Sequence, residues 1–307
     1  MTYDCIIIGG GPAALAAAIY FARQKISFLM IAGTIGGKTL WSSDVENYLG
    51  FHLISGIDLV KKFEQHVADY QDQFTLKRDE YVHEVATELT GFRVHTDKGV
   101  YASRMLLVAT GQENRKLNVP GETELYGHGL TYCATCDGPL YRDKQVHVIG
   151  GGNSAMDAAL LLEKYAERVT IVALNPELSG DAVMKQKCLA SDKIAIHTGT
   201  RTTKIIGSTL VEGIGLIGPD GVERIEPSQG VFIEIGQVPN TGFLKDMPIE
   251  KDRSGQIIVD ARNRTSVRNV WAAGDVTNVT EKQIAVAVGE GSKAALDIIK
   301  QLQSQHL

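Results

Sequence analysis

Two cysteines separated by two other residues have the clearest capacity for chemistry in this sequence, in the stretch Cys133-Ala134-Thr135-Cys136. At this spacing two cysteines can form a strained, reducible disulfide, and such a motif lowers the pKa of one thiol. The spacing therefore predicts a redox-active dithiol. Two other interpretations stay open: a pair of inert thiols, and half of a zinc site, although a structural zinc site needs four ligands and the sequence holds no second cysteine pair. Cys5 and Cys188 are expected to be buried small apolar residues.

A carboxylate directly follows the second cysteine. Asp137 can hold or release the proton that a departing thiolate needs, which makes it a candidate general acid. The same side chain can instead cap the turn that begins at Gly138-Pro139. The sequence offers no partner for His128 or His147, so we expect both to be structural.

An internal repeat supplies the elements that must position the dithiol. Two segments, aligned without a gap so that Gly9 matches Gly150, each read as strand, glycine-rich turn, helix and strand. The expected elements are the strands 4–8, 27–31, 146–149 and 169–172 and the helices 15–23 and 156–165. Each turn fits the dinucleotide fingerprint with alanine in place of the third glycine, at Gly9, Gly11, Ala14 and at Gly150, Gly152, Ala155. The repeat predicts an α/β protein of two Rossmann-like three-layer nucleotide-binding domains.

Further strands extend both copies and define the domain organisation. The expected elements are strand 104–109 running into Ala109-Thr110-Gly111, closing strand 231–236, strand 269–273 running into Gly274-Asp275, and helix 283–301. We therefore expect a split first domain, 1–113 and 243–307, with the second domain, 114–242, inserted in it and carrying the dithiol. Asp275 can hold ribityl or ribose hydroxyls, or it can cap a helix.

Composition excludes several classes of protein. The chain has 307 residues, of which 44% are hydrophobic and 22% charged, with a formal net charge of -5. An acidic chain without a basic block argues against nucleic acid as the main partner. No apolar run approaches the roughly 18 residues that span a bilayer, and the N-terminus lacks the positive region of a signal peptide. We expect a soluble, cytoplasmic protein without a membrane or nucleic-acid partner.

The stretch Tyr132 to Gly138, both glycine-rich turns and Gly274-Asp275 together resemble the low-molecular-weight thioredoxin reductases, class II of the pyridine nucleotide-disulfide oxidoreductases. The resemblance covers essentially the whole chain and extends to Gly36-Gly37, Glu46-Asn47-Tyr48 and Lys282-Gln283-Ile284. It implies non-covalently bound FAD. The residues that match the FAD motifs of the family are Gly9, Gly11, Pro12, Ala13, Ala14, Gly36, Gly37, Asn47, Ala109, Thr110, Gly111, Gly274, Asp275, Lys282, Gln283 and Ile284.

The resemblance also implies a role for each chemical group. Cys136 would meet the flavin, Cys133 would attack the disulfide of thioredoxin or a thioredoxin-like protein, and Asp137 would be the acid. The family works as a homodimer, and its inserted domain rotates between a pose for flavin contact and a pose for nucleotide contact. Two connecting segments at an insertion are a plausible hinge.

The electron donor is where this sequence departs from the family. The second turn offers Gly150, Gly152, Asn153, Ser154 and Ala155 to NADPH or NADH. NADPH-dependent members carry arginines after the next strand, which pair with the 2′-phosphate, but the segment 172–181 contains none. NADH enzymes place a carboxylate at the strand end, where this chain has Ala173 and Leu174, and Glu177 is a possible substitute from the loop. We favour NAD(P)H marginally over reduced ferredoxin or a deazaflavin.

Three other functions remain open at this point. The segment 282–291 also resembles the flavoprotein of alkyl hydroperoxide reductase, so a peroxiredoxin-type partner is possible; that flavoprotein carries an extra N-terminal thioredoxin-like domain, which we do not expect here. A dithiol oxidase would run the same path in reverse, from a small dithiol to oxygen. A flavin-bound redox sensor would use the same groups without turnover.

Overall fold

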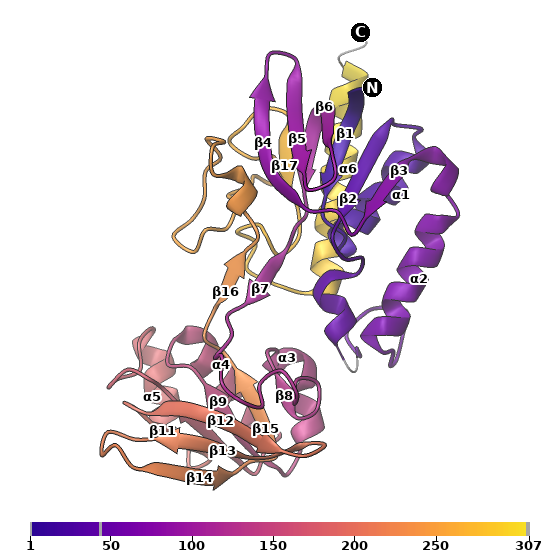
Figure 1. The fold of residues 1–307 in the computed structure, drawn as a ribbon. Helices are drawn as coiled ribbons and strands as arrows, with labels where there is room; N and C mark the ends of the chain where they lie inside the picture. Colours follow the sequence, from indigo (N-terminus) through magenta and orange to yellow (C-terminus); the bar gives the residue numbers. More distant parts are fainter. Residues whose placement is uncertain (1, 43–44, 305–307) are drawn as a thin grey trace. The chain divides into compact units, whose positions relative to one another are not determined.

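The computed structural model describes residues 2–42 and 45–304, and the chain forms two compact units. One unit joins the chain up to Glu113 to the chain from Val238 onward, and the other is the continuous stretch Asn114–Gln237 (Figure 1). Two short strands, β7 (Gln112–Asn114) and β16 (Gln237–Pro239), carry the chain from one unit to the other and pair with each other.

The return crossing between the units lies at 237–238, whereas the sequence analysis placed it at 242–243. The difference arises because Asn240 is already bound within the first unit. Its backbone N–H donates to the Gly111 carbonyl at 3.1 Å, and its side-chain amide donates to the Thr110 carbonyl at 3.1 Å. Hydrogen bonds to the end of a distant strand leave no signal in a local sequence pattern.

The first unit is built around a mostly parallel sheet. Its strands are β1 (Thr2–Ile8), β2 (Phe28–Ala32), β3 (Thr75–Arg78), β4 (Val82–Glu88), β5 (Gly91–Thr96), β6 (Val100–Val108) and β17 (Val270–Ala272). Its helices are α1 (Pro12–Arg23), η1 (Gly37–Trp41), α2 (Gly56–Ala68), η2 (Gln71–Gln73), η4 (Gly242–Leu244) and α6 (Ile284–Ser304). The strand order is β3-β2-β1-β6-β5-β4, and β17 pairs in parallel with β6. β5 is antiparallel to the first half of β6, and β4 is antiparallel to β5.

Alternating side chains of β1 divide the core of the first unit into two layers. Cys5 and Ile7 belong to the core that contains residues of α1 and α6, whereas Ile6 and Ile8 belong to the core on the other face of the sheet. This alternation follows from the two-residue period of a strand. The layers explain why β1 reads as an uninterrupted apolar run, because both of its faces are covered.

The second unit is also built around a parallel sheet, and it has a separate antiparallel sheet in addition. Its strands are β8 (Leu130–Thr131), β9 (Gln145–Ile149), β10 (Arg168–Val172), β11 (Ile194–His197), β12 (Arg201–Gly207), β13 (Val211–Ile217), β14 (Glu223–Pro227) and β15 (Gly230–Ile233). Its helices are α3 (Ala134–Asp137), η3 (Gly138–Tyr141), α4 (Asn153–Leu162) and α5 (Ala182–Ala190). The parallel sheet has the order β11-β10-β9-β15-β8, and β12-β13-β14 form a separate antiparallel sheet. Both units therefore have the predicted Rossmann-like α/β fold, with the second inserted in the first.

Each glycine-rich turn passes so close to a neighbouring strand end that only glycine fits. Gly9 has φ 126° and Gly150 has φ 145°, both in the region that favours glycine. A Cβ on Gly9 would collide with the carbonyl of Ala109, and one on Gly150 would collide with the carbonyl of Glu234. The two turns are thus held by the same steric constraint at equivalent places.

The helix after the second turn begins earlier than the sequence pattern suggested. The apolar periodicity predicted 156–165, but α4 starts at Asn153, directly after its N-cap Gly152, and ends at Leu162. The turn itself therefore forms the start of the helix, as it does for α1, whose N-cap is Gly11. Neither glycine has a side chain to cap the first-turn N–H groups, so these groups can meet a ligand.

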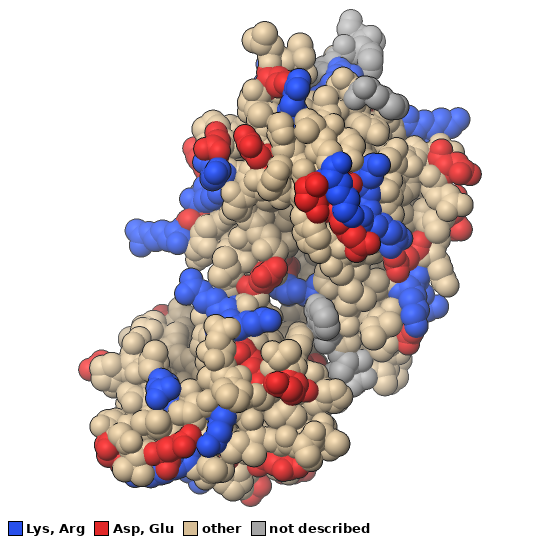
Figure 2. All heavy atoms as spheres, in the orientation of Figure 1, with Lys and Arg blue, Asp and Glu red and all other residues tan. Residues whose placement is uncertain are grey.

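Charged side chains of both signs lie interspersed over each unit on the face drawn in Figure 2. Within the described chain, no helix combines the length and the apolar character needed to cross a membrane.

His147, in the middle of β9, is buried and has partners that the sequence analysis did not find. Its Nδ1 lies 3.0 Å from Ser228 Oγ, and its Nε2 lies 3.1 Å from a carboxylate oxygen of Glu226. Burial lowers the pKa of His147 below its ordinary value, and the neighbouring Glu226 carboxylate opposes this effect. The ring links the parallel sheet to β14 and to the residue after it.

We expect this histidine to make the fold less stable in acid. Because its pKa is lower in the folded than in the unfolded chain, the unfolded chain binds more protons as the pH falls. The contribution is complete above the unfolded value of about 6.5 and is lost as pH falls through the folded value. Thermal unfolding measured from pH 8 to pH 5 should show a flatter pH dependence for His147→Asn than for the unsubstituted protein.

The matched control for this stability measurement is His128→Asn, because His128 is exposed. That variant should keep the pH dependence of the unsubstituted protein. An unchanged pH dependence in His147→Asn would show that the buried ring is not the titrating group. The midpoint temperature of unfolding is a sensitive measure, since a change of about 1 kcal/mol in the free energy of unfolding moves it by about 2–4 °C in a chain of this size.

Candidate functional site

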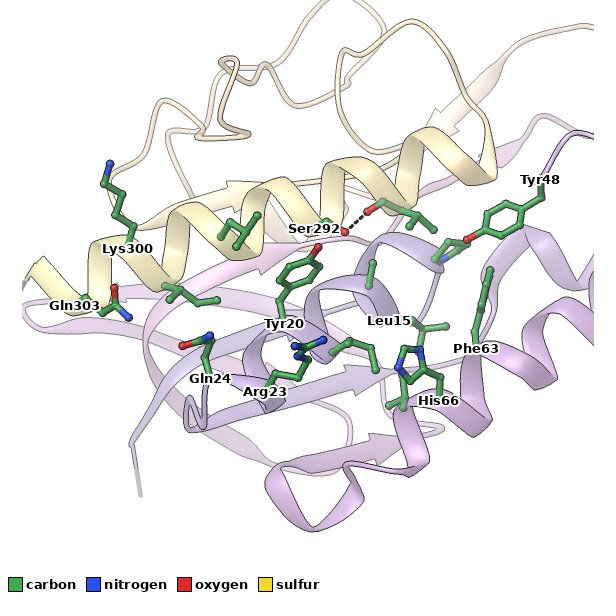
Figure 3. A pocket seen from close by; sticks show the side chains of 17 residues that line it. Leu15, Tyr20, Arg23, Gln24, Tyr48, Phe63, His66, Ser292, Lys300 and Gln303 are labelled. Carbon is green, nitrogen blue, oxygen red and sulfur yellow. Dashed lines mark hydrogen bonds between the residues drawn. The ribbon is translucent and has the colours of Figure 1, made fainter. Parts of the chain in front are cut away.

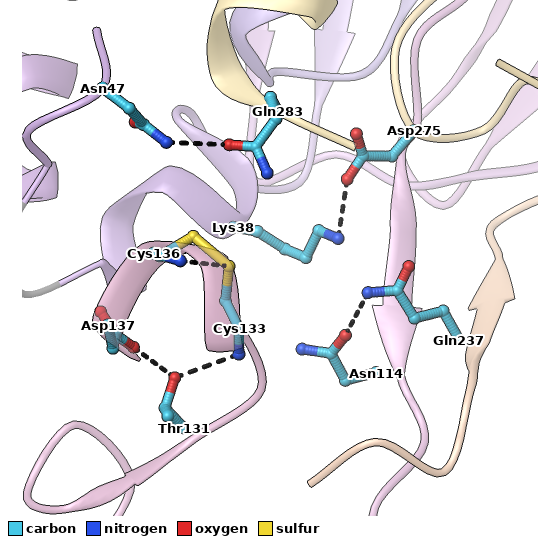
Figure 4. Close-up of a disulfide and its surroundings, with 10 residues drawn as sticks. All are labelled: Lys38, Asn47, Asn114, Thr131, Cys133, Cys136, Asp137, Gln237, Asp275 and Gln283. Carbon is cyan, nitrogen blue, oxygen red and sulfur yellow. Dashed lines mark hydrogen bonds and ion pairs between the residues drawn. A yellow bond between two sulfur atoms is a disulfide. The ribbon is translucent and has the colours of Figure 1, made fainter. Parts of the chain in front are cut away.

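The two motif cysteines are bonded to each other in the second unit. Cys133 and Cys136 form a disulfide with Cα atoms 5.3 Å apart (Figure 4). The short helix α3 starts at the residue after Cys133, and the N–H of Cys136 donates to Cys133 Sγ at 3.1 Å. Among residues 2–42 and 45–304, no group of three or more His, Cys, Asp and Glu side chains is arranged to hold a metal ion. Cys5 and Cys188 are free and buried, as predicted.

The disulfide directly follows a strand that the sequence analysis did not find, and it lies ahead of the expected strand 146–149. The strand is β8, which has only two residues and pairs in parallel with β15. An apolar run this short has no recognisable period, so it could not be found from the sequence. Its consequence is that the motif is attached directly to the edge of the parallel sheet.

A threonine on β8 joins the acid to the disulfide, and sequence analysis missed it. Thr131 Oγ1 donates a short hydrogen bond to Asp137 Oδ2 and accepts the N–H of Cys133 at 3.2 Å. The N–H of Asp137 donates to the carbonyl of Cys133 at 3.1 Å. Asp137 is the N-cap of η3, but its side chain makes no capping hydrogen bond there. The carboxylate therefore faces Thr131 and does not cap the following turn.

The charge of Asp137 also affects the pKa values of two neighbouring tyrosines. Burial, with the Asp137 charge as the second cause, raises the pKa of Tyr141 to about 12. The same two causes raise the pKa of Tyr126. Both phenols therefore stay protonated near neutral pH.

In the first unit, the predicted FAD residues form a cradle around the turn after β1. A Cβ on Gly11 would meet no atom within 4 Å, so a ligand can approach its backbone closely. The N–H of Gly36 donates to the carbonyl of Gly10 at 2.7 Å, which holds η1 against the turn. Gly274 has φ 78° and packs against Ala13. The small residues thus bring three separated segments together.

Two polar pairs join segments of this cradle that are far apart in the sequence. Lys38 Nζ lies 2.7 Å from a carboxylate oxygen of Asp275, and Asn47 donates its side-chain amide to Gln283 at 3.1 Å (Figure 4). Asp275 lies nine residues before the first residue of α6, so it does not cap that helix. The sequence analysis did not find Lys38, whose only signal is its place after Gly36-Gly37.

A buried carboxylate fixes the turn that carries Asp275. Glu290, on α6, accepts the N–H of Gly274 at 2.8 Å and the hydroxyl of Thr277 at 3.1 Å. Lys282 is tied nearby, with its ammonium group donating to the Thr277 carbonyl at 2.5 Å. Burial lowers the pKa of Lys282, while the carboxylates of Asp275 and Glu290 oppose this effect.

The remaining predicted residues of the cradle have structural positions within the same unit. Pro12, Ala13 and Ala14 form the first turn of α1, Ala109, Thr110 and Gly111 follow β6, and Ile284 is the first residue of α6. Thr110 Oγ1 donates to the carbonyl of Asn240 at 2.7 Å, so its hydroxyl is used within the unit. The glycine-lined turn, the unpartnered first-turn N–H groups and the strand-end carboxylate fit a dinucleotide such as FAD.

The glycine-rich turn of the second unit is intact, but the loop after β10 folds onto it. The N–H of Ser179 donates to the carbonyl of Gly151 at 2.7 Å, and the side chain of Asn153 accepts the N–H of Asp181 at 2.8 Å. Ala173, at the strand end, is fully buried. Among the described residues of this loop, no charged side chain lies at the strand end, where a ribose is usually held.

Glu177 does not replace that missing charged group in the conformation described. Its carboxylate is highly exposed and pairs with Lys185 at 3.5 Å. Ser154 and Asn153 are also exposed in the first turn of α4, and Ala155 is buried beneath it. The first turn of α4 is therefore open to solvent, and Glu177 is engaged with Lys185 away from it.

A cavity lies elsewhere, among α1, α2 and α6 of the first unit. It has a volume of about 820 Å³. The side chains around it are largely apolar, and Tyr20, Arg23, Lys300 and Gln303 also line it (Figure 3). Of the residues predicted for the site, only Pro12 lines it.

The chain is similar to known proteins in both sequence and structure. A profile of the family described as pyridine nucleotide-disulphide oxidoreductase matches residues 3–291. The chain is 40% identical over 298 residues to the F subunit of alkyl hydroperoxide reductase from Pseudomonas putida, covering 96% of this chain and 57% of the relative. It is 37% identical over 297 residues to a protein named NADH dehydrogenase from Bacillus subtilis, covering 96% and 57%. The chain thus spans little more than half the length of these curated relatives.

A solved structure matches over nearly the full length of both chains. Thioredoxin reductase from Streptococcus pyogenes MGAS5005 superimposes with a TM-score of 0.92 at 34% identity, covering 99% of this chain and 99% of that chain.

We expect Thr131 to control how readily the disulfide opens, because its hydroxyl holds the acid beside it. In Thr131→Val the carboxylate of Asp137 loses this partner, and a lost hydrogen bond of about 1 kcal/mol corresponds to a roughly fivefold slower reaction. The measurement is the rate at which dithiothreitol reduces the Cys133–Cys136 bond, followed by thiol trapping and mass spectrometry. Thr131→Ser keeps the hydroxyl and should keep the rate; equal rates in the serine and valine variants would contradict the role.

Proposed function

This chain belongs to the pyridine nucleotide-disulphide oxidoreductase family, and we propose that it is a thioredoxin reductase-like flavoprotein. Electrons from a reduced pyridine nucleotide pass through FAD and the Cys133–Cys136 disulfide to the disulfide of thioredoxin or a thioredoxin-like protein. The observation that carries the proposal is a closed disulfide tied through Thr131 to Asp137, in a unit that also holds a nucleotide-type turn. The likeness to a thioredoxin reductase along the whole chain supports it.

The first unit is the place for FAD. Its glycine-rich turn would receive the diphosphate, and Asp275 would hold hydroxyls of the ligand, with Lys38 as its present partner. When bound, FAD supplies a carrier that accepts two electrons from the donor and passes them to the disulfide. The hydrogen bond from Asn47 to Gln283 joins the N-terminal and C-terminal segments of this unit.

In the reduced protein, the two sulfurs exchange bonds with the partner disulfide. The thiolate of Cys133 attacks one partner sulfur, the partner S–S bond breaks, and a mixed disulfide forms. The departing partner sulfur takes a proton from Asp137, which Thr131 holds in place. Cys136 then gives its proton back to Asp137, and its sulfur attacks Cys133. The bond between Cys133 and the partner breaks, and the second partner sulfur leaves with the proton from Asp137. The partner gains two electrons, and the Cys133–Cys136 bond is formed again.

The donor within this proposal is NADH or NADPH with weak selectivity. The turn at Gly150 and Gly152 supports a nucleotide, because a pyrophosphate needs only close backbone and free N–H groups. The buried Ala173 leaves the ribose without a charged partner. The same feature supports the alternative, in which reduced ferredoxin or a deazaflavin supplies the electrons.

A second partner class is supported by the curated relatives. Several of them are named as the F subunit of alkyl hydroperoxide reductase, so a peroxiredoxin-type disulfide is the alternative acceptor. The same two cysteines would serve it, because the exchange needs only an accessible partner disulfide. Homodimer formation stays a prediction from the family resemblance.

We expect both motif cysteines to be essential for disulfide reduction. Cys133→Ser and Cys136→Ser should each lose at least roughly a hundredfold in turnover, measured as insulin reduction with added thioredoxin, because each removes one of the two exchanging sulfurs. Cys5→Ser and Cys188→Ser are controls, since both thiols are buried and free, and both should turn over normally. Full activity in Cys136→Ser would rule out the proposed path.

We expect NADH and NADPH to reduce the flavin at similar concentrations, within about tenfold of each other, because neither ribose form meets a charged side chain. The measurement is an anaerobic titration of flavin absorbance. Gly152→Asp is a matched variant: a Cβ there has room, and a carboxylate would repel the pyrophosphate, so nucleotide reduction should fail while dithionite still reduces the flavin. Failure of both nucleotides with the unsubstituted protein, together with reduction by a ferredoxin system, would replace this donor with the alternative.

A further inference from the structure

A buried carboxylate is bonded to the residue that directly precedes the redox motif. Glu122, in the segment between β7 and β8, has only 4% of its surface exposed. Its Oε1 accepts the hydroxyl of Tyr132 at 2.6 Å, and Tyr132 is followed at once by Cys133. Neither side chain takes part in the exchange of sulfurs proposed above, so the pair invites another role.

The backbone before Glu122 holds its carboxylate in place. The N–H groups of Leu117 and Asn118 donate to its two oxygens at 2.8 Å and 2.7 Å. Asn118 has φ 56°, a left-handed conformation that asparagine adopts more readily than most residues, and turns of this kind can aim successive N–H groups at one anion. Because a buried charge needs such partners, the carboxylate is a fixed anchor for the Tyr132 hydroxyl.

The segment that carries Glu122 is itself packed on the antiparallel sheet of the second unit. The N–H of Ile205, on β12, donates to the carbonyl of Pro120 at 2.8 Å. Gly121 has φ 87°, and a Cβ there would lie 2.0 Å from the carbonyl oxygen of Ile205. Tyr132 is therefore tied, through Glu122, to a sheet separate from the parallel sheet that carries the disulfide.

The ring of Tyr132 is held as well as its hydroxyl. It packs edge-on against the ring of Tyr126, with ring centroids 5.3 Å apart, and it lies against a core built from strands of both sheets. Burial, followed by the hydrogen bond to Glu122, raises the pKa of Tyr132. The hydroxyl therefore stays protonated near neutral pH and keeps donating to the carboxylate.

Cys133 is thus fixed from both directions along the chain. On its C-terminal side, its carbonyl accepts the N–H of Asp137 at 3.1 Å, and its Sγ accepts the N–H of Cys136 at 3.1 Å. On its N-terminal side, Tyr132 is anchored to Glu122. A disulfide closes most readily when both sulfurs are already held near their bonded positions, because less conformational freedom is then lost.

We propose that Glu122 and Tyr132 are positioning residues of the redox centre: the hydrogen bond between them holds Cys133 where it can close the disulfide, and so favours the closed pair over the open dithiol. The inference rests on the proposed function for its effect on turnover. Without this bond the open form gains conformational freedom around Cys133, and closing becomes less favourable.

The test is the equilibrium of the purified protein with mixtures of reduced and oxidised glutathione, with open and closed pairs counted by thiol trapping and mass spectrometry. Two glutathione thiols give two electrons and two protons to the Cys133–Cys136 bond, which yields one glutathione disulfide and two protein thiols. Tyr132→Phe keeps the ring and removes the hydroxyl, and Glu122 keeps its two backbone donors. We expect the equilibrium of this variant to lie about three- to tenfold further toward the dithiol, the factor that corresponds to a typical net hydrogen bond.

The matched control is Ser191→Ala. Ser191 also donates its hydroxyl to a carboxylate, that of Glu163, at 2.6 Å, and this bond joins the ends of α4 and α5 in the same unit. Both variants should unfold at a lower temperature, but only Tyr132→Phe should shift the glutathione equilibrium. An unshifted equilibrium in Tyr132→Phe, or a shift toward the disulfide, would overturn the inference, as would an equal shift in Ser191→Ala.

A second measurement needs no variant and serves if Tyr132→Phe does not fold. Because coupling is reciprocal, opening the disulfide must weaken the hold on the N–H groups of Leu117 and Asn118. In the unsubstituted protein, amide hydrogen exchange at these two residues should be about three- to tenfold faster in the reduced than in the oxidised form, whereas the amides of β13 should exchange equally in both. Equal rates at Leu117 and Asn118 in the two forms would overturn the inference.

Neither measurement needs an electron donor or a partner protein. A shifted equilibrium in a protein that fails to reduce thioredoxin would therefore reject only the proposed function. Normal turnover with an unshifted equilibrium would reject only the role of Glu122 and Tyr132.

Discussion

Both halves of this protein depend on one steric constraint, the close passage of a glycine-rich turn past the end of the neighbouring strand. At Gly9 the neighbour is the carbonyl of Ala109, and at Gly150 it is the carbonyl of Glu234. Any side chain on either glycine would force these backbones apart and with them the helix that starts after the turn. The geometry at the starts of α1 and α4 therefore follows from backbone packing, and each unit is arranged around a position where only glycine fits.

The parts of the fold that could be predicted from the sequence are those with a local cause. The two turns, their flanking strands and the insertion of one unit in the other follow from residue spacing, and the structure confirms the fold. The pairing of Cys133 with Cys136 was accessible for the same reason, since a three-residue separation places the sulfurs within reach of each other. The boundary near Asn240 was misplaced because the bonds that fix it run to a strand end far away in the sequence.

The groups that sequence reasoning missed share a different property: each acts through a contact between distant segments. Thr131 lies on a strand of two residues, too short to show a pattern. Lys38 meets Asp275, and His147 meets Glu226 and Ser228, only after the sheets have formed. Single residues of common types carry no spacing signal, so such contacts become visible only in three dimensions. The choice of electron donor is only partly visible in the sequence. The sequence shows that the segment 172–181 has no arginine, but it does not show that Ala173 is buried.

The paired strands that join the two halves have a consequence for how this architecture can be taken apart. The ends of the inserted half are held together, with Arg115 N–H donating to the Gly236 carbonyl at 3.0 Å and the Gln237 amide donating to Asn114 at 2.7 Å. Because the second unit is one continuous stretch whose two ends lie together, it can be inserted as a whole into a loop of another protein. The first unit consists of two chain segments, which a short linker would have to join before the unit could be produced alone. Only the second unit can therefore be transferred without such a linker.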